Sequence, residues 1–231
     1  KPAKVGYFAG CTATYRSTKT SAATISILKK LNVDFTTVDE ICCGSVMQRI
    51  GWPEDDVVGM MRKNVNNIKA LGIETLVLSC AGCYRMFKKE YPKHLGELPF
   101  KVLHITEFLA EQDLKLKPMA GVATYHDPCH LGRHCGVYDA PRAVIAKIPE
   151  LQFKEMEFTR NLSHCCGGGG GVRSAFPEES GRIARTRVDE AEFADYIITT
   201  CPFCVNNLIL GLGDRKDKKV VDLTELVDEL L

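Results

Sequence analysis

Residues 164–171 have the sequence HCCGGGGG, in which two adjacent cysteines precede a run of five glycines. A disulfide between neighbouring cysteines has strained geometry, and a glycine loses more conformational freedom on folding than any other residue. The combination therefore needs a chemical reason. We predict that the two thiolates bind a metal cluster and that the glycines let the backbone come close to it.

Ten of the eleven cysteines form two blocks with the same order. The first block is C-x30-CC-x36-C-x2-C and the second is C-x35-CC-x34-C-x2-C, offset by about 120 residues, or half the chain. Repetition at this length indicates a duplicated domain rather than a solenoid of short repeats. The blocks consist of Cys11, Cys42, Cys43, Cys80 and Cys83, and of Cys129, Cys165, Cys166, Cys201 and Cys204.

Strand-like and helical segments alternate around these cysteines. Strand-like runs end at the first cysteine of each block and at each C-x-x-C pair, and helical periodicity occupies the segments 20–32, 55–72 and 180–194. This alternation predicts an α/β fold of two pseudo-symmetric repeats, each a mostly parallel sheet flanked by helices. We place the two domains at residues 1–116 and 117–231, with a linker at 114–121.

The cysteines follow predicted strands, which has a consequence for their position. Parallel sheets bind ligands beyond the carboxyl ends of their strands, so the five thiols of each block are expected to meet there. A structural zinc ion takes four ligands, and so does a cubane [4Fe–4S] cluster. Five cysteines with a vicinal pair favour a larger or opened iron–sulfur assembly, and structural zinc stays open as an alternative.

Composition limits the remaining classes of protein. The 231 residues carry a net charge of +1 and are 45% apolar, so no nucleic-acid or membrane-surface partner is indicated. No apolar run approaches the roughly 18 residues of a membrane span, and the N-terminus lacks a signal-peptide pattern. A secreted disulfide scaffold is disfavoured by the length and the odd cysteine count. We expect reduced thiols in a cytoplasmic protein, and the chain could be a fragment of a longer one.

Several polar side chains accompany the cysteines. An arginine can hold a carboxylate, phosphate or sulfonate through two hydrogen bonds, and a histidine can donate a proton to a leaving thiolate. Among the candidates, which also include Arg49, Arg85, His126, His134 and His164, we select His130, Arg133 and Arg173 as catalytic. We expect His126, together with Asp127, to hold the strand-to-loop turn before Pro128. Cys135, outside both blocks, is interpreted as a buried free thiol.

The doubled pattern resembles the CCG (cysteine-rich) domain family. Its members include catalytic subunits of heterodisulfide reductases and iron–sulfur subunits of lactate, glycolate and glycerol-3-phosphate oxidation systems. The phrases FAGCT, YHDPCHLGR, HCCGGGGGVR and CPFCVNNL are most similar to the B subunits of heterodisulfide reductases and to the corresponding half of their D subunits. The resemblance implies two noncubane [4Fe–4S] clusters, each held by the five cysteines of one block.

The resemblance also implies a function. It indicates the catalytic subunit of a disulfide reductase that cleaves a substrate of the coenzyme M–coenzyme B heterodisulfide type between its two clusters. Relatives of the D type have an upstream ferredoxin-like segment that this sequence does not show, so electrons are expected from partner subunits with ferredoxin-type clusters or flavin, or from a missing upstream part. Membrane association is expected only through a partner. The alternatives are an electron-transfer subunit of a lactate, glycolate or glycerol-3-phosphate oxidation system, and a structural zinc module.

Overall fold

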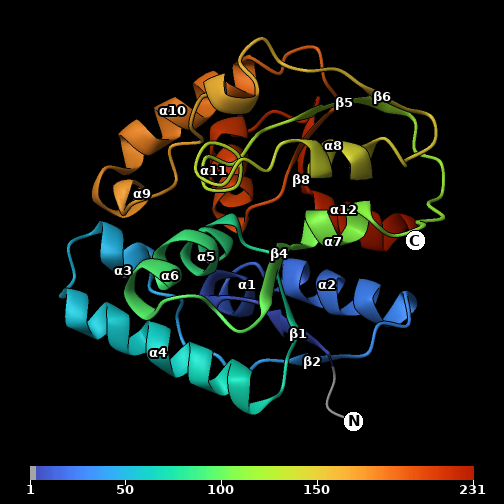
Figure 1. Cartoon of the computed structure of the whole chain (residues 1–231). Coiled ribbons are helices and arrows are strands. Elements are labelled where there is room, and N and C mark those ends of the chain that lie inside the picture. Colours follow the sequence, from blue (N-terminus) through green and yellow to red (C-terminus); the bar gives the residue numbers. More distant parts are fainter. Residues whose placement is uncertain (1–3) are drawn as a thin grey trace.

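The computed structural model describes residues 4–231 and contains two four-stranded sheets in which all paired strands are parallel. The predicted α/β fold with two repeats is therefore confirmed. In Figure 1 the first repeat, coloured blue to green, lies below the second, coloured yellow to red. The predicted boundary between residues 116 and 117 stays a prediction; residues 111–120 contain neither helix nor strand and connect the two sheets.

The first repeat contains a sheet of strand order β2-β1-β3-β4. Its strands have short apolar runs, such as Thr75–Leu78 with three consecutive buried residues, as expected for parallel strands covered on both faces. Its elements are β1 (Val5–Phe8), α1 (Cys11–Tyr15), α2 (Thr18–Lys30), β2 (Phe35–Thr37), α3 (Ser45–Arg49), α4 (Glu54–Ala70), β3 (Thr75–Leu78), α5 (Ala81–Arg85), a π-helix (Met86–Glu90), α6 (Tyr91–Leu95), β4 (Lys101–His104) and α7 (Ile105–Ala110).

The second repeat has the equivalent strand order β6-β5-β7-β8. Its helix α10 ends at Asp189, five residues before the predicted end, and it begins earlier because Pro177 occupies its first turn, where the fixed proline φ suits a helix start. The elements are β5 (Gly121–Tyr125), α8 (Asp139–Ile145), β6 (Leu151–Phe153), a 3-10 helix (Arg160–Leu162), α9 (Val172–Ala175), α10 (Pro177–Asp189), β7 (Tyr196–Thr199), α11 (Pro202–Leu212), β8 (Lys219–Asp222) and α12 (Leu223–Leu230).

The strand order places the cysteines at a topological switch point. From β1 the chain crosses first to β2 on one side and then to β3 on the other, so the connections after β1 and β3 diverge and leave a crevice. Cys11 follows β1 and Cys80 follows β3. In the second repeat, β5 and β7 are the corresponding neighbours, and Cys129 and Cys201 follow them. The cysteines therefore gather where parallel sheets bind ligands.

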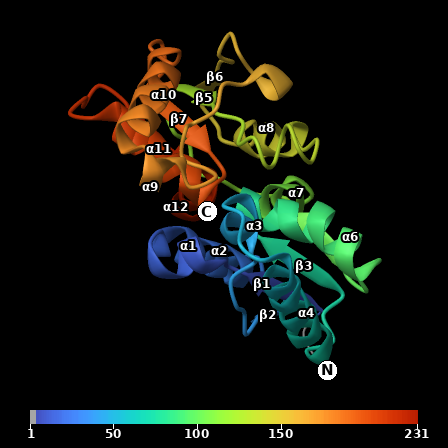
Figure 2. The same cartoon turned by 90° about the vertical axis from the view of Figure 1, so that its left-hand side faces the viewer.

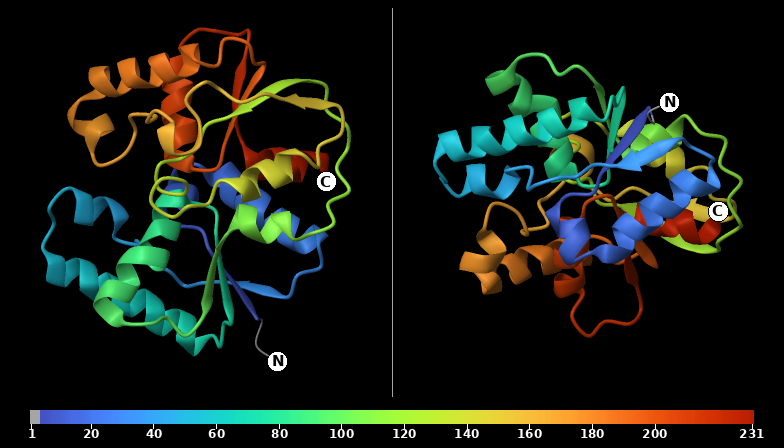
Figure 3. Two further views of the ribbon diagram at one scale, coloured as in Figure 1. Left: turned by 45° about the horizontal axis from the view of Figure 1, so that its top comes forward. Right: turned by 90° about the horizontal axis from the view of Figure 1, so that it is seen from below.

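Two equivalent helix pairs join the repeats. Helix α7 of the first repeat packs against α8 of the second, and α12 of the second packs against α2 of the first, as Figures 2 and 3 show from other sides. The buried face of α2 has helical spacing, with Ala23, Ile27 and Leu28 inside. One apolar cluster extends across this boundary and contains residues from both sheets. The pairing is symmetric, because α7 and α12 follow the last strands of their repeats.

A membrane span is not found among the described helices, since none combines the length and apolar character that crossing a bilayer requires.

Candidate metal centres and the pocket between them

The two CCG loops have the same local geometry. The amide of Gly44 donates to Cys42 Sγ at 3.4 Å, and the amide of Gly167 donates to Cys165 Sγ at 3.3 Å. Both glycines have φ near +80° (82° and 79°), a conformation that side chains with a Cβ rarely adopt. The glycine after each vicinal pair thus turns its N–H toward the preceding sulfur, as the sequence predicted for backbone near a thiolate.

The C-x-x-C pairs begin helices directly after buried strands. Cys80 is the N-cap of α5 and Cys201 is the N-cap of α11, both with extended backbone. The partial positive charge at a helix N-terminus favours the thiolate form of a cysteine placed there. Cys83 and Cys204 lie in the first turns of the same helices and are buried. The motif therefore presents two thiolates from one rigid strand-to-helix corner in each repeat.

All ten predicted cysteines form one continuous series of thiols that affect one another's pKa. Within it, Cys11 Sγ lies 4.0 Å from Cys42 Sγ, and Cys166 Sγ lies 3.4 Å from Cys204 Sγ. Each thiol interacts with the next one in the order Cys11, Cys42, Cys43, Cys83, Cys80, Cys201, Cys204, Cys166, Cys165 and Cys129.

The central contact of this series joins the two repeats. Cys80 and Cys201 occupy equivalent positions, and their thiols interact with each other. The contact with Cys201, followed by that with Cys83, lowers the pKa of the Cys80 thiol. Cys135 interacts with none of the ten, and burial raises the pKa of its thiol to about 11. The structure therefore brings all ten cysteines of the two blocks together and leaves the eleventh outside.

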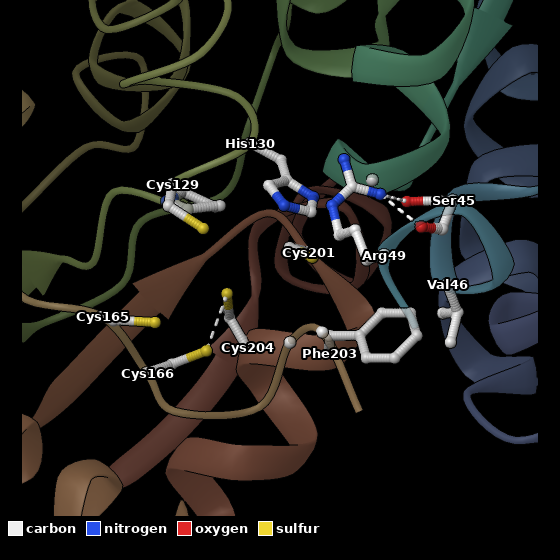
Figure 4. A pocket seen from close by; sticks show the side chains of 14 residues that line it. Ser45, Val46, Arg49, Cys129, His130, Cys165, Cys166, Cys201, Phe203 and Cys204 are labelled. Atoms are coloured by element: carbon white, nitrogen blue, oxygen red, sulfur yellow. Dashed lines mark hydrogen bonds between the residues drawn. The ribbon is translucent and has the colours of Figure 1, made fainter. Parts of the chain in front are cut away.

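A pocket with an empty volume of about 480 Å³, part of it open to solvent, lies between the repeats. All five cysteines of the second block line it, and α3 of the first repeat supplies Ser45, Val46 and Arg49 to the opposite wall (Figure 4). The glycine run contributes Gly169 and Gly170 to the wall. Sulfur ligands from one repeat and a cationic side chain from the other thus face the same space.

Arg49 is a partly buried cation whose charge is not neutralised by a carboxylate in the described chain. Its Nη1 donates to the carbonyl oxygen of Ser45 and, at 2.6 Å, to the Ser45 hydroxyl. Its Nη2 is buried and finds no partner within residues 4–231. Glu90, whose charge acts on the pKa of Arg49, already forms ion pairs with Arg85 and Lys93. Desolvation, and then the charge of Arg85, lowers the pKa of Arg49. A buried charge of this kind favours an anionic neighbour.

His130 is the one of the three selected catalytic residues that lines this pocket. Its imidazole points between Cys129 and Arg49 in Figure 4. Burial, assisted by the charges of Arg49 and Arg85, lowers the pKa of His130 to about 4. The ring is therefore neutral at pH 7 and offers a hydrogen bond rather than a surplus proton.

Arg133 and Arg173 lie outside the pocket. Arg133 donates from Nε to the carbonyl oxygen of Asn161 at 3.2 Å and from Nη2 to that of Ser163 at 2.5 Å, so it supports the loop before Cys165. Arg173 lines a neighbouring hollow, and desolvation, followed by the charge of Arg16, lowers its pKa. Neither guanidinium faces the space between the sulfurs and Arg49.

His126 lies beside sulfurs of the second block as well as at the turn expected for it. It directly follows β5, at the turn predicted from the sequence, and a ring nitrogen also lies with Cys166 Sγ and Cys204 Sγ in a group whose members are all within 4.8 Å of one another. The signal was available in the sequence, because aligning the two blocks on their first cysteines sets His126 against Phe8. The other residue that sequence reasoning undervalued is Arg49, which folding rather than spacing brings to the second block.

Comparison with known proteins agrees with this geometry. The model of the CCG cysteine-rich domain matches the chain twice, at residues 5–88 and 123–209. The chain belongs to the CCG cysteine-rich domain family. It is 44% identical to the D subunit of the dihydromethanophenazine:CoB–CoM heterodisulfide reductase of Methanosarcina mazei, over 99% of this chain and 59% of the relative. It is 37% identical to the B subunit of the fumarate reductase (CoM/CoB) of Methanothermobacter marburgensis, over 97% of this chain and 46% of the relative.

These CCG relatives are longer than the chain, which spans about half of their length. Among solved structures, a hypothetical protein from Helicobacter pylori matches 100% of this chain and 49% of that chain with a TM-score of 0.71. Its sequence identity is 11%, so this likeness concerns the fold alone.

Proposed function

We propose that the chain is the catalytic iron–sulfur part of a disulfide reductase, with two noncubane [4Fe–4S] clusters that act on a thiol-cofactor disulfide of the coenzyme M–coenzyme B type. The observation that carries the proposal is the series of ten interacting thiols beside a pocket with an unneutralised arginine. Membership of the CCG family and the printed name of the M. mazei relative support it.

The donor set fits an iron–sulfur group. Thiolates are soft ligands suited to iron–sulfur clusters and zinc, and each repeat supplies five of them, one more than a zinc ion accepts. The amides of Gly44 and Gly167 add hydrogen bonds to sulfur of the kind that tune such clusters. We propose that the first cluster is held by Cys11, Cys42, Cys43, Cys80 and Cys83, and the second by Cys129, Cys165, Cys166, Cys201 and Cys204.

The reaction consumes two electrons and two protons, because RS–SR′ + 2e⁻ + 2H⁺ gives RSH + R′SH. Bound clusters would supply the electrons one at a time, which gives a physical reason for two sites beside one substrate. The chain's own residues bind and orient the disulfide. Arg49 stabilises negative charge that develops on sulfur, and His130 donates a hydrogen bond from its neutral ring. The protons come from solvent that enters the open side of the pocket.

The partners follow from the electron count. We propose that subunits or segments with ferredoxin-type clusters or flavin deliver the electrons. The two proposed clusters of this chain would only receive these electrons and pass them to the substrate. The names of the relatives, which describe subunits, support a multi-subunit setting. We also propose a cytoplasmic position, with contact to a membrane only through such a partner.

A second candidate function is electron relay without substrate turnover in this chain. The specific observation in its favour is that relatives with different printed activities share this region, among them the B subunit of the fumarate reductase (CoM/CoB). If the region serves several reactions, part of its role is to carry electrons. A structural zinc module is the third candidate, and metal analysis separates it from the first two.

The test combines metal analysis with turnover in anaerobically purified protein, supplied with a reduced viologen as donor and the coenzyme M–coenzyme B heterodisulfide as substrate. We expect about eight irons per chain with little zinc, as two tetranuclear clusters require, and release of two thiols per disulfide. Full iron with no turnover would favour relay. One or two zinc ions without iron would support the structural module and overturn the proposal.

A further inference from the structure

The two repeats differ at one buried position that faces their sulfurs. The tyrosines that precede it are equivalent, since Tyr7 bonds to Ser79 and Tyr125 bonds to Thr200 through their hydroxyls, both at 2.8 Å. The next residue is Phe8 in the first repeat and His126 in the second. Phe8 is 0% exposed and packs against the ring of Phe87, whereas His126 is 1% exposed and adjoins Cys166 and Cys204.

A hydrogen bond fixes the tautomer of His126. Nε of Arg187 donates to its Nδ1 at 3.1 Å. A guanidinium has only donors, so Nδ1 must accept and cannot carry a proton. The ring is neutral, because a protonated imidazole carries a hydrogen on both nitrogens and could not accept at Nδ1. The single ring proton therefore resides on Nε2.

The hydrogen bond from Arg187 to His126 is held in place by the burial and the other contacts of Arg187. It is 0% exposed, and its remaining donors are used by the carbonyl oxygen of Phe158 at 2.9 Å, the hydroxyl of Ser163 at 3.0 Å and the carboxylate of Glu190. The first repeat has Asn64 as the fully buried polar residue of the helix before its third strand. Asn64 bonds to the backbone of Ile41 and Cys42, so it holds a loop and no imidazole.

The protonated nitrogen lacks a partner in the described protein. Nε2 of His126 is buried and forms no hydrogen bond within residues 4–231. A buried N–H donor without an acceptor is costly, so it requires a group that the protein itself does not supply. A ring nitrogen of His126 lies within 4.8 Å of the Cys166 and Cys204 sulfurs, so thiolate sulfurs, and a group that they bind, are the acceptors beside the ring.

From this arrangement we propose that His126 donates an Nε2–H···S hydrogen bond to the iron–sulfur cluster of the second repeat, with Arg187 as the positioning residue that fixes the tautomer. The inference rests on the proposed function only in requiring a cluster at the second site. Because an N–H donor stabilises the more negative, reduced cluster, this contact raises the reduction potential of the second cluster. The first cluster, with Phe8 at the equivalent position, receives no such bond.

The proposal also excludes a role for His126 as a metal ligand. A ligating nitrogen needs a free lone pair, and both nitrogens are committed, Nδ1 to Arg187 and Nε2 to its proton. The group of His126, Cys166 and Cys204 is thus two thiolates and a hydrogen-bond donor rather than a three-ligand zinc site.

Two substitutions test the hydrogen bonds of His126. His126→Phe reproduces the residue of the first repeat and removes the N–H, whereas His126→Gln keeps an N–H at the reach of Nε2. His126→Gln also offers an amide oxygen that can accept from Arg187, whereas His126→Phe removes donor and acceptor together. Their difference therefore reports the polar contacts of His126 as a unit. His94→Gln, at a partly exposed histidine that pairs with Glu54, is the matched control.

The measurement is a potentiometric titration of the whole iron-loaded protein, followed by electron paramagnetic resonance. We expect His126→Phe to lower one of the two midpoint potentials by an amount equal to about a tenfold change in electron occupancy, or about 59 mV for one electron. The other midpoint stays unchanged, and His126→Gln lies near the wild type. Equal potentials in all variants, or the same shift in both clusters, would overturn the proposal, as would loss of iron in both His126 variants.

A second readout does not depend on variants that fold. In wild-type protein with ¹⁵N-labelled histidine, the paramagnetic second cluster should couple to a proton that exchanges in D₂O, with only weak ¹⁵N coupling. Strong ¹⁵N coupling would instead identify His126 as a ligand and contradict the proposal. Absence of iron in the wild type is a separate result that counts against the proposed function itself.

Discussion

The thiols of Cys80 and Cys201, the first cysteines of the two C-x-x-C pairs, interact across the boundary between the repeats, and each shifts the pKa of the other. Each is the N-cap of the helix that follows the third strand of its repeat. The series of thiol contacts runs outward from this pair in the same order on both sides. The two predicted cluster sites therefore share a boundary, and a perturbation at one of these two thiols reaches both sites.

Cysteine substitutions test the division into two sites. Cys165→Ser removes a thiol that contacts only members of the second block, so we expect iron to fall by about half and one of two cluster signals to disappear. Cys135→Ser is the control, because Cys135 contacts none of the ten, and it should retain all the iron. Iron analysis and electron paramagnetic resonance give the result. Equal loss of both signals in Cys165→Ser would contradict two separate sites.

Arg49 tests substrate binding. We expect Arg49→Gln to raise the KM for an anionic disulfide about tenfold or more, since a charge-assisted hydrogen bond to a buried group contributes about 1.5–3 kcal/mol. A neutral disulfide of similar size should be affected much less. Arg173→Gln, outside the pocket, is the matched control and should leave both KM values unchanged. Steady-state kinetics with the two disulfides decides, and an equal rise for both would argue against recognition of an anion by Arg49.

Gly167 tests the geometry of the CCG loop. Its φ is +79°, and a Cβ there would lie 2.9 Å from the carbonyl oxygen of Ser180, so Gly167→Ala should destabilise the protein by about 1–3 kcal/mol. Gly169→Ala is the control within the same glycine run, because a Cβ at Gly169 meets nothing within 4 Å. Denaturant unfolding followed by circular dichroism measures both. Similar stability of the two variants would show that the loop tolerates a Cβ at Gly167.

Asp222 predicts a pH dependence of stability. Burial, and then the charge of Glu225, raises the pKa of this carboxyl from 3.8 to about 7. The folded state therefore binds the proton more tightly than the unfolded state, and the resulting stabilisation is full below 3.8 and is lost as pH rises through 7. At about 1.4 kcal/mol per pH unit, wild type should lose about 2–3 kcal/mol between pH 5 and pH 8 relative to Asp222→Asn.

The Asp222→Asn variant is a fair comparison because it keeps the helix cap. Oδ1 of Asp222 accepts from the amide of Thr224 at 2.8 Å, and an asparagine oxygen can do the same. Unfolding experiments across this pH range check the prediction. Parallel stability curves for wild type and variant would mean that the carboxyl is ionised throughout.

The repeated cysteine pattern was sufficient to predict much of this architecture. The strands before Cys11, Cys80, Cys129 and Cys201 were predictable because short apolar runs precede each motif, and parallel pairing then fixed the edge at which the thiols meet. The position of Arg49 was not predictable in this way. Nothing in its spacing from Cys43 indicates that α3 faces the other repeat, since that depends on how α7, α8, α2 and α12 pack.

Arg133 shows the converse. It is four residues from Cys129 in the sequence, yet its guanidinium binds loop carbonyl oxygens and Arg133 is not among the residues that line the pocket. Closeness in sequence does not determine the direction of a long side chain, because rotamers and local hydrogen bonds decide it. The role of Arg187 was equally hidden, since its partner His126 lies sixty-one residues away.

Phe8 and His126 occupy equivalent positions in the two repeats, and this difference bears on why both repeats belong to one polypeptide. Two identical subunits related by exact symmetry would have to carry the same residue at that place, so any change beside one of the two proposed clusters would be imposed on the other. Covalent fusion removes this restraint. The two halves can keep the same fold while the reduction potential of each proposed cluster is adjusted separately. A difference in potential between two electron carriers can then arise within a single polypeptide.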